Sequence, residues 1–184
     1  IAITLENSGT KVTLSHTLTN KNAWDVECSL WALTVVAPGG TEVVPQCQID
    51  TDLLPNRMIS LWPYAKMNDP RVVWGEKYIL LKQDPKTKQP FKVGISNFEG
   101  WVCYANNQGL FVKRFDPIEG ALYPDYSAST YETYTTDYML EMESLSPLTR
   151  LKPDGVVTHE ERWFLFDQTK IPYTEEDVDK TIIP

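Results

Sequence analysis

Residues 131–144, YETYTTDYMLEMES, decide the fold class because they are rich in the aromatic and β-branched residues typical of strands. Side chains alternate between the two faces of a strand, so Glu141 and Glu143 share one face while Met142 points the other way. Carboxylates on one face of a sheet suit either acid/base chemistry on a sugar or a solvated surface. The stretch therefore predicts a sheet and marks Glu132, Glu141 and Glu143 as candidate functional groups.

Alternating runs separated by turn residues recur along the rest of the chain. Residues 1–6 and 11–20 flank Asn7-Ser8-Gly9, which predicts a hairpin. Asn106-Asn107-Gln108-Gly109 predicts a second hairpin turn. Further predicted strands occupy residues 24–36, 72–83, 91–95, 101–104, 110–115 and 156–167. About ten strands, with no long helical segment, indicate an all-β antiparallel sandwich or open barrel.

The length of 184 residues fits one domain with a real core. We assign residues 1–167 to a β-sandwich domain. Residues 168–184 form a polar C-terminal tail, expected to pack loosely, in which TEEDVDK favours one or two helical turns with Thr174 as N-cap.

Charge and motif content exclude several functions. The net charge of −8 argues against nucleic-acid and membrane-surface partners, and no run of 18 apolar residues predicts a membrane span. No dinucleotide, P-loop or zinc-protease motif occurs, so we expect no cofactor. Two histidines and three cysteines without CxxC spacing predict neither a metal site nor a disulfide framework.

The chain starts at Ile1 inside a predicted strand, without Met or a signal peptide. This start favours a processed or truncated chain. The sequence leaves the compartment open, and a periplasmic or extracellular location would follow if a signal peptide had been removed. Exposed strand edges would then pair with a missing N-terminal segment or with a second copy.

Several polar and aromatic side chains are candidates for ligand binding. Residues 53–64 bring Arg57, Trp62 and Tyr64 together, a set that either clamps a polar ring or anchors a loop. Arg71 in the following turn is a further candidate cation, and Glu27 is a carboxylate in an otherwise apolar run.

Lysines and histidines within the predicted strands are further candidates. Lys92 and Lys113 either reach outward to solvent or bind an anionic sugar. His16 lies on an apolar face, which favours a hydrogen-bonded core histidine. His159 shares a predicted strand face with Glu161 and is a candidate to assist catalysis.

Glycoside chemistry uses two carboxyl groups whose separation sets the stereochemical outcome. Residues two apart on a strand lie roughly 6.5 to 7 Å apart at the backbone. Glu141 and Glu143 would form an acid/base pair if their surroundings separated their pKa values. The alternative is a pair of surface glutamates.

Several segments taken in order resemble a bacterial domain family of unknown function in the galactose mutarotase-like group. They are LTNKNAWDVECSLWALTVVAPGG, LLPNRMISLWPY followed by NDPR, KVGISNFEGWVCYANNQGLFVKRF, YPD, YETYTTDYMLEMESLSPL and HEERW. The resemblance covers roughly residues 3–166. It implies an antiparallel β-supersandwich of the galactose mutarotase-like (aldose 1-epimerase-like) kind that binds sugar on a concave sheet face. It also implies that the N-terminal strands of the full domain are missing here.

The resemblance to aldose 1-epimerases also implies residue roles. Their base is a Glu in a Leu-Glu-x-Gln pattern, and residues 140–143 (LEME) resemble it, with Glu141 as base and Glu143 in place of Gln. The region that resembles their catalytic His motif, residues 27–31, contains no His, and His159 does not match its position. This departure removes the expected proton donor.

These observations predict a carbohydrate-binding or sugar-processing protein whose partner is a sugar or oligosaccharide. Two alternatives remain open. One is an aldose epimerase or lyase with Glu141 as base, and the other is a structural or interaction domain that pairs through its edge strands.

Overall fold

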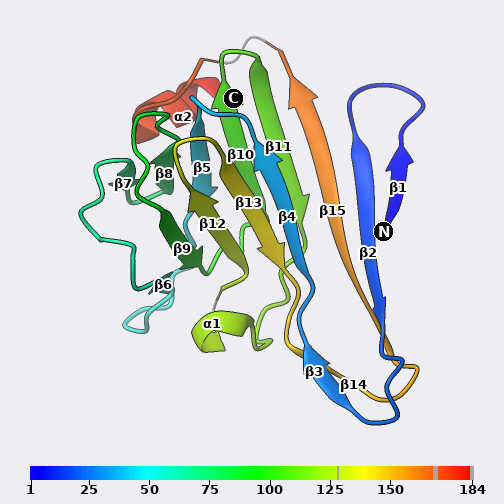
Figure 1. Cartoon of the computed structure of the whole chain (residues 1–184). Helices are drawn as coiled ribbons and strands as arrows, with labels where there is room; N and C mark the ends of the chain where they lie inside the picture. Colours follow the sequence, from blue (N-terminus) through cyan, green and yellow to red (C-terminus); the bar gives the residue numbers. More distant parts are fainter. Residues whose placement is uncertain (128, 168–169, 183–184) are drawn as a thin grey trace.

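The computed structural model describes residues 1–127, 129–167 and 170–182 and is built from antiparallel sheets (Figure 1). The largest sheet has eight strands. In spatial order they are β1 (Ala2–Leu5), β2 (Val12–Thr19), β15 (Val156–Phe166), β11 (Gly109–Phe115), β10 (Trp101–Asn106), β5 (Thr41–Pro45), β8 (Tyr78–Lys82) and β7 (Val72–Trp74).

A second sheet of five strands packs against the first. Its order is β4 (Trp31–Val36), β13 (Leu140–Leu145), β12 (Tyr131–Thr135), β9 (Phe91–Ile95) and β6 (Ile59–Leu61). A two-stranded sheet pairs β14 (Thr149–Leu151) with β3 (Val26–Cys28). Two short helices are α1 (Pro124–Ser127) and α2 (Glu175–Thr181). The predicted all-β sandwich is therefore confirmed.

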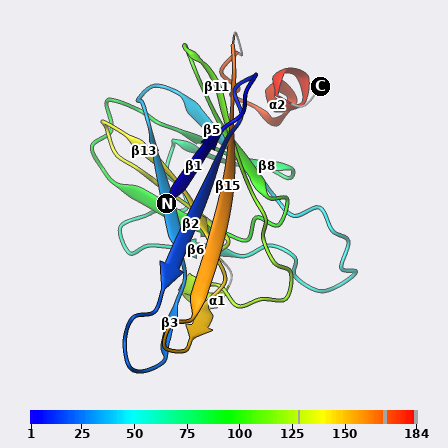
Figure 2. The ribbon, with the colours of Figure 1, turned by 90° about the vertical axis from the view of Figure 1, so that its right-hand side faces the viewer.

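Both predicted hairpins are present. β1 pairs with β2, with Ala2 opposite Ser15, and Asn106 faces Gly109 across the turn between β10 and β11. β2 and β15 are long antiparallel strands: β2 runs down toward β3, and β15 runs back up from that end (Figure 2).

The main core lies between the eight-stranded and five-stranded sheets. Alternation directs one face of each strand of the five-stranded sheet inward. The fully or nearly fully buried inward residues include Phe91, Val93, Tyr131, Leu140 and Met142. The Phe115 and Tyr131 rings stack across the core with centroids 5.9 Å apart. The opposite face of the five-stranded sheet points away from the core.

In the structure, two of the predicted strands are each divided into two shorter strands, so their prediction as continuous strands is wrong. The run 24–36 forms β3 and β4, which belong to different sheets. The break is fixed by Ser146, whose carbonyl accepts from Ser29 Oγ at 2.5 Å and whose Oγ accepts from Leu30 N at 2.8 Å. The run 72–83 forms β7 and β8 around Gly75, where an added Cβ would collide with Glu175 of α2.

The helix in the tail follows its sequence signals. Thr174 caps α2, as predicted, and the structure adds a capping box between Thr174 and Asp177. The expectation of a loosely packed tail is wrong for this helix, because Val178 is fully buried against the core cluster that contains Val43 and Leu80. Neither helix that the structure describes is long and apolar enough to cross a membrane.

Candidate functional site

The outer face of the five-stranded sheet gathers charged and aromatic side chains. The strand register places Glu143 opposite Glu132, and Tyr134 opposite both Glu141 and Lys92. All five alternate with core residues on their strands and therefore project away from the core.

Lys92 lies at the centre of this outer-face cluster. Its Nζ is 2.7 Å from Glu143 Oε2 and 2.9 Å from Glu132 Oε2. The same nitrogen lies 4.7 Å from the ring centroid of Trp31 and 4.8 Å from that of Trp62. Trp31 Nε1 donates to Glu143 Oε2 at 2.6 Å, which fixes its indole beside the lysine. The ammonium is held by two carboxyl groups and two aromatic faces, an arrangement that combines charge-assisted and cation–π interactions.

Burial raises the pKa values of two carboxyl groups near Lys92, those of Glu132 and Glu141. Burial and the neighbouring Asp125 raise the pKa of Glu132 to about 8, although Lys92 opposes the shift. Burial and the nearby Glu143 raise the pKa of Glu141 above its usual range. Burial alone lowers the pKa of Lys92, but its bonds to Glu143 and Glu132 outweigh burial and raise it. Near neutral pH the cluster therefore holds a protonated Glu132 beside an ammonium.

A cavity of about 430 Å³ opens beside the cluster. It is lined by Ser29, Trp31, Trp62, Lys92, Pro124, Asp125, Glu132, Leu145 and Leu148. Asp125 and Tyr126 have φ values of 53° and 66°, left-handed backbone that is costly for these residue types. Ser60 Oγ donates to the carbonyl of Asp125 at 3.1 Å and so ties this strained segment to β6. The segment keeps the Asp125 carboxylate at the cavity rim.

The structure brings together five of the residues singled out from the sequence. Glu132, Glu141, Glu143 and Trp62 belong to the outer-face cluster or adjoin it. Tyr64 adjoins it as well: burial raises the pKa of its hydroxyl, and the charges of Lys92, Glu143 and Glu132 act on it.

Three other candidates lie elsewhere in the fold. Glu27 is exposed on β3, opposite Arg150 of β14. Arg57 precedes β6 and donates from Nε to the carbonyl of Cys47 at 3.3 Å. Arg71 is buried and binds Asp69 through Nε and Nη2 at 3.0 and 2.9 Å, so it fixes a turn.

Lys113 and His159 lie inside the sandwich. Lys113 Nζ is 2.6 Å from Glu161 Oε1 and donates to the carbonyl of Met142 at 2.8 Å, so the expectation that it reaches solvent is wrong. His159 Nε2 is 2.7 Å from Ser144 Oγ, which lies on the inner face of β13. The structure therefore does not bring His159 together with Glu141 on the outer face.

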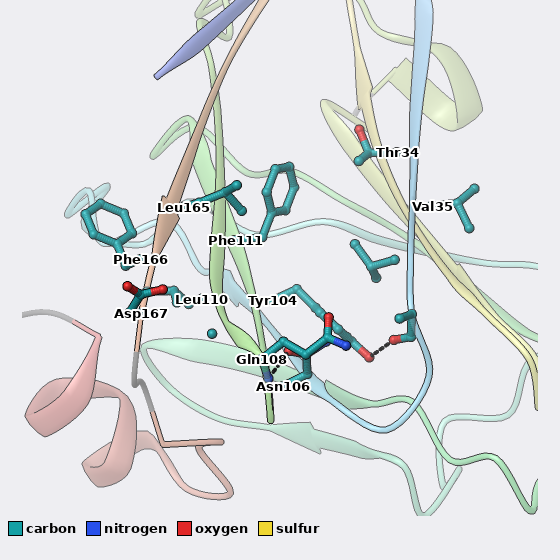
Figure 3. A pocket seen from close by; sticks show the side chains of 13 residues that line it. Thr34, Val35, Tyr104, Asn106, Gln108, Leu110, Phe111, Leu165, Phe166 and Asp167 are labelled. Carbon is teal, nitrogen blue, oxygen red and sulfur yellow. Dashed lines mark hydrogen bonds between the residues drawn. The ribbon is translucent and has the colours of Figure 1, made fainter. Parts of the chain in front are cut away.

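Another cavity, also about 430 Å³, lies between β4 and the β11–β15 pair (Figure 3). Its lining includes Val36, Phe111 and Leu165, and Tyr104 donates from its hydroxyl to the carbonyl of Ala37 at 2.6 Å. Asp167 is the only carboxylate among the described lining residues, and none of these is basic. One charged residue lines this cavity, whereas three line the cavity beside the cluster, so the outer-face cluster is the better candidate site. Within the described ranges, no group of three or more His, Cys, Asp and Glu side chains has an arrangement that could hold a metal ion.

Trp31 is not among the candidates from the sequence, and Lys92 is predicted there either to reach solvent or to bind an anionic sugar. Lys92 alternates with Phe91 and Val93, which assigns it to the outer face. Trp31 belongs to a run in which many residues are apolar, so its exposure on the outer face gave no separate signal. Only the order of β4, β13, β12, β9 and β6 shows that the two residues meet.

Comparison with known proteins identifies the fold. The chain is similar to the crystal structure of a candidate aldose 1-epimerase from Klebsiella pneumoniae, with a TM-score of 0.59 and 15% identity over 87% of this chain and 44% of that one. It is also similar to a candidate aldose 1-epimerase from Escherichia coli K12, with a TM-score of 0.52 and 12% identity over 86% of this chain and 57% of that one. No family model and no curated protein matches the sequence.

These two structural similarities identify the fold class of the chain. The chain has the antiparallel, galactose mutarotase-like fold of the aldose 1-epimerase-like group, as the sequence resemblance implied. It spans about half the length of the two structures, and at this level of identity the likeness concerns the fold alone.

Proposed function

We propose that the chain is a carbohydrate-binding or sugar-processing protein and that the outer-face cluster holds the sugar. The observation that carries the proposal is the pair of Trp31 and Trp62 rings on either side of polar Lys92, within a cavity large enough for a small ligand. The shared fold with two candidate aldose 1-epimerases supports the same class of ligand.

The chemistry of the cluster suits a sugar ring. A pyranose presents apolar C–H faces and a rim of hydroxyl groups, so it needs both flat apolar surfaces and hydrogen-bonding groups. Trp31 is about half exposed and offers its indole to the ligand. Glu132 and Lys92 supply acceptors and donors at the cavity wall.

Titration of Trp31→Ala with a panel of neutral, amino and acidic hexoses tests this site. We expect the native chain to gain thermal stability with at least one sugar, through ligand linkage, and the variant to bind that sugar about tenfold more weakly. Trp24→Ala is the matched control, because Trp24 is also exposed but lies in the loop between β2 and β3. Equal losses in both variants would overturn the assignment of the site.

A second candidate function, proton transfer on the bound sugar, is favoured by the raised pKa of Glu132. A carboxyl group whose pKa is raised to about 8 is a proton donor near neutral pH. Glu141 and Glu143 lie on the same face and are candidate bases, as the sequence predicts.

Anomer exchange of the bound sugar, followed by NMR, separates the two candidates. If the chain processes sugar, exchange is faster with the native chain and slows at least about a hundredfold in Glu132→Gln and Glu141→Gln. Binding without faster exchange would leave a binding protein. Normal exchange rates in both variants would exclude these residues from the chemistry.

A further inference from the structure

The outer-face cluster carries more carboxyl groups than cations. Asp125 adjoins Glu132, and Glu141 adjoins Glu143. Lys92 is the only basic residue among the described residues that line the cavity. Its ammonium already contacts two carboxyl groups, and an ammonium has only three hydrogen atoms to donate. The cavity is therefore poor in cationic groups for an acidic ligand and rich in acceptors.

Two buried carboxyl oxygens of the cluster receive no hydrogen bond from a nitrogen or hydroxyl donor among the residues that the structure describes, and the neighbours of their side chains are further carboxyl groups, Asp125 and Glu141. The two oxygens are Glu132 Oε1 and Glu143 Oε1, on side chains that are 3% and 0% exposed. Glu132 lines the cavity, so a ligand donor that enters there can reach its carboxyl group. A buried, unpaired polar oxygen is costly, and a charged donor compensates it best.

The aromatic walls of the cavity also favour a cation. Trp31 and Trp62 already hold one ammonium, that of Lys92, within 5 Å of their ring centroids, at 4.7 and 4.8 Å. Indole faces attract ammonium groups through the negative potential of the ring. A second ammonium between these rings and the carboxyl groups would meet the same kind of surroundings.

We infer that the cavity selects an amino sugar, a hexose with a free, protonated amino group, over neutral and acidic hexoses. The inference rests on the proposed sugar-binding function. The amino group donates to the Glu132 carboxyl group, in place of that group's contact with Asp125, while the pyranose ring lies against Trp31. When this ammonium binds, Glu132 gives up its proton to solvent and pairs as a carboxylate.

Calorimetric titration of the whole chain with glucosamine, N-acetylglucosamine, glucose and glucuronate, and with the same galacto sugars, tests the inference. N-acetylation keeps the ring and removes only the charge. We expect the free amino sugar of the preferred ring to bind at least about tenfold more tightly than its N-acetylated form, and glucuronate or galacturonate to bind most weakly.

Glu132→Gln should reduce this preference for the amino sugar to about twofold or less, because an amide offers no charge to the ammonium. Glu76→Gln is the control, since Glu76 is exposed between β7 and β8 of the other sheet. Equal affinity for amino and N-acetyl sugars, or an unchanged preference in Glu132→Gln, would overturn the inference while leaving sugar binding intact. No binding of any hexose would overturn the proposed function itself.

Discussion

At the scale of single residues, burial decides which charges this protein carries. Glu42 and Glu132 both have pKa values raised to about 8, and the pKa of His159 is lowered to about 4. In each case burial is the largest cause, because a low-dielectric interior disfavours the charged form. Sequence alone would give these three groups their ordinary pKa values. In the folded chain the shifted values favour their neutral forms near pH 7.

His159 should make the fold sensitive to acid. Its pKa falls from 6.5 to about 4 on folding, so the folded state resists protonation. The free energy of unfolding is unaffected by this group above pH 6.5 and decreases by up to about 3 kcal/mol as the pH drops to 4.

Urea unfolding of the native chain and His159→Gln between pH 4 and pH 7 measures this effect. We expect a shallower loss of stability with falling pH in the variant, since Gln does not titrate. Identical slopes in the two proteins would show that other groups cause the acid sensitivity.

Glu42 should have the opposite pH dependence. Its pKa rises from 4.5 to about 8 on folding, so its contribution to stability is complete below pH 4.5 and is lost as the pH rises through 8. Glu42→Gln keeps an acceptor for the Tyr131 hydroxyl, which bonds to Glu42 in the native core.

We therefore expect Glu42→Gln to gain stability relative to the native chain as the pH increases from 5 to 9. Thermal unfolding across that range gives the comparison. A variant that loses stability equally at every pH would show that the carboxyl group is ionised in the folded state.

At the scale of elements, α2 is held to the eight-stranded sheet by one buried side chain and a set of polar contacts. Glu175 Oε1 accepts from the backbone of Lys77 and Tyr78 at 2.6 and 2.9 Å. Asp179 binds Lys77 Nζ at 2.7 Å and the Tyr78 hydroxyl at 3.0 Å. Exposed ion pairs contribute little, so the apolar contact of Val178 must carry most of the stabilisation.

Val178→Ala should lower the free energy of unfolding by about 2 kcal/mol, because it leaves a cavity under the helix. Glu176→Ala, on the exposed side of α2, should change it by less than about 0.5 kcal/mol. Urea unfolding tests both. If both substitutions had equally small effects, packing of Val178 against the sheet would not be what stabilises α2.

At the scale of the whole molecule, a buried lysine, Lys113, links the two main sheets. Lys113 of β11 binds Glu161 of β15 and donates to the carbonyls of Ala32 and Met142, which belong to β4 and β13. Burial outweighs the pairing and lowers the pKa of Lys113, whereas the pairing lowers the pKa of Glu161 despite its burial. The bonds from Lys113 to the Ala32 and Met142 carbonyls fix how the sheets face each other.

Lys113→Met should destabilise the chain by about 3 to 5 kcal/mol, because it leaves the Glu161 carboxylate buried without its cation. The double variant Lys113→Met with Glu161→Leu removes both charges and should recover much of that loss. Guanidinium unfolding of the single and double variants gives the coupling between the two residues. A double variant less stable than Lys113→Met would show that polar contacts, rather than charge compensation, dominate here.

The sequence by itself determined the class of fold and most of the strands. Alternation in residues 131–144 and the turn at Asn106 to Gly109 are local signals, and the structure confirms both. The resemblance to the mutarotase-like group is likewise confirmed by the fold. Alternation also put Glu141 and Glu143 on one face of their strand, but the sequence could not tell whether that face is a site or merely solvated.

Tertiary structure alone decided which side chains meet. Lys92 and Trp31 lie 61 residues apart in sequence numbering and come together only through the order of β4, β13, β12 and β9. Lys92 and Lys113 look alike in sequence, yet one lies on the outside of a sheet and the other is sealed between two sheets. The physical reason is that alternation fixes the face of a side chain within its strand, whereas the neighbours of that face, and hence burial and charge state, depend on how distant strands pair and pack.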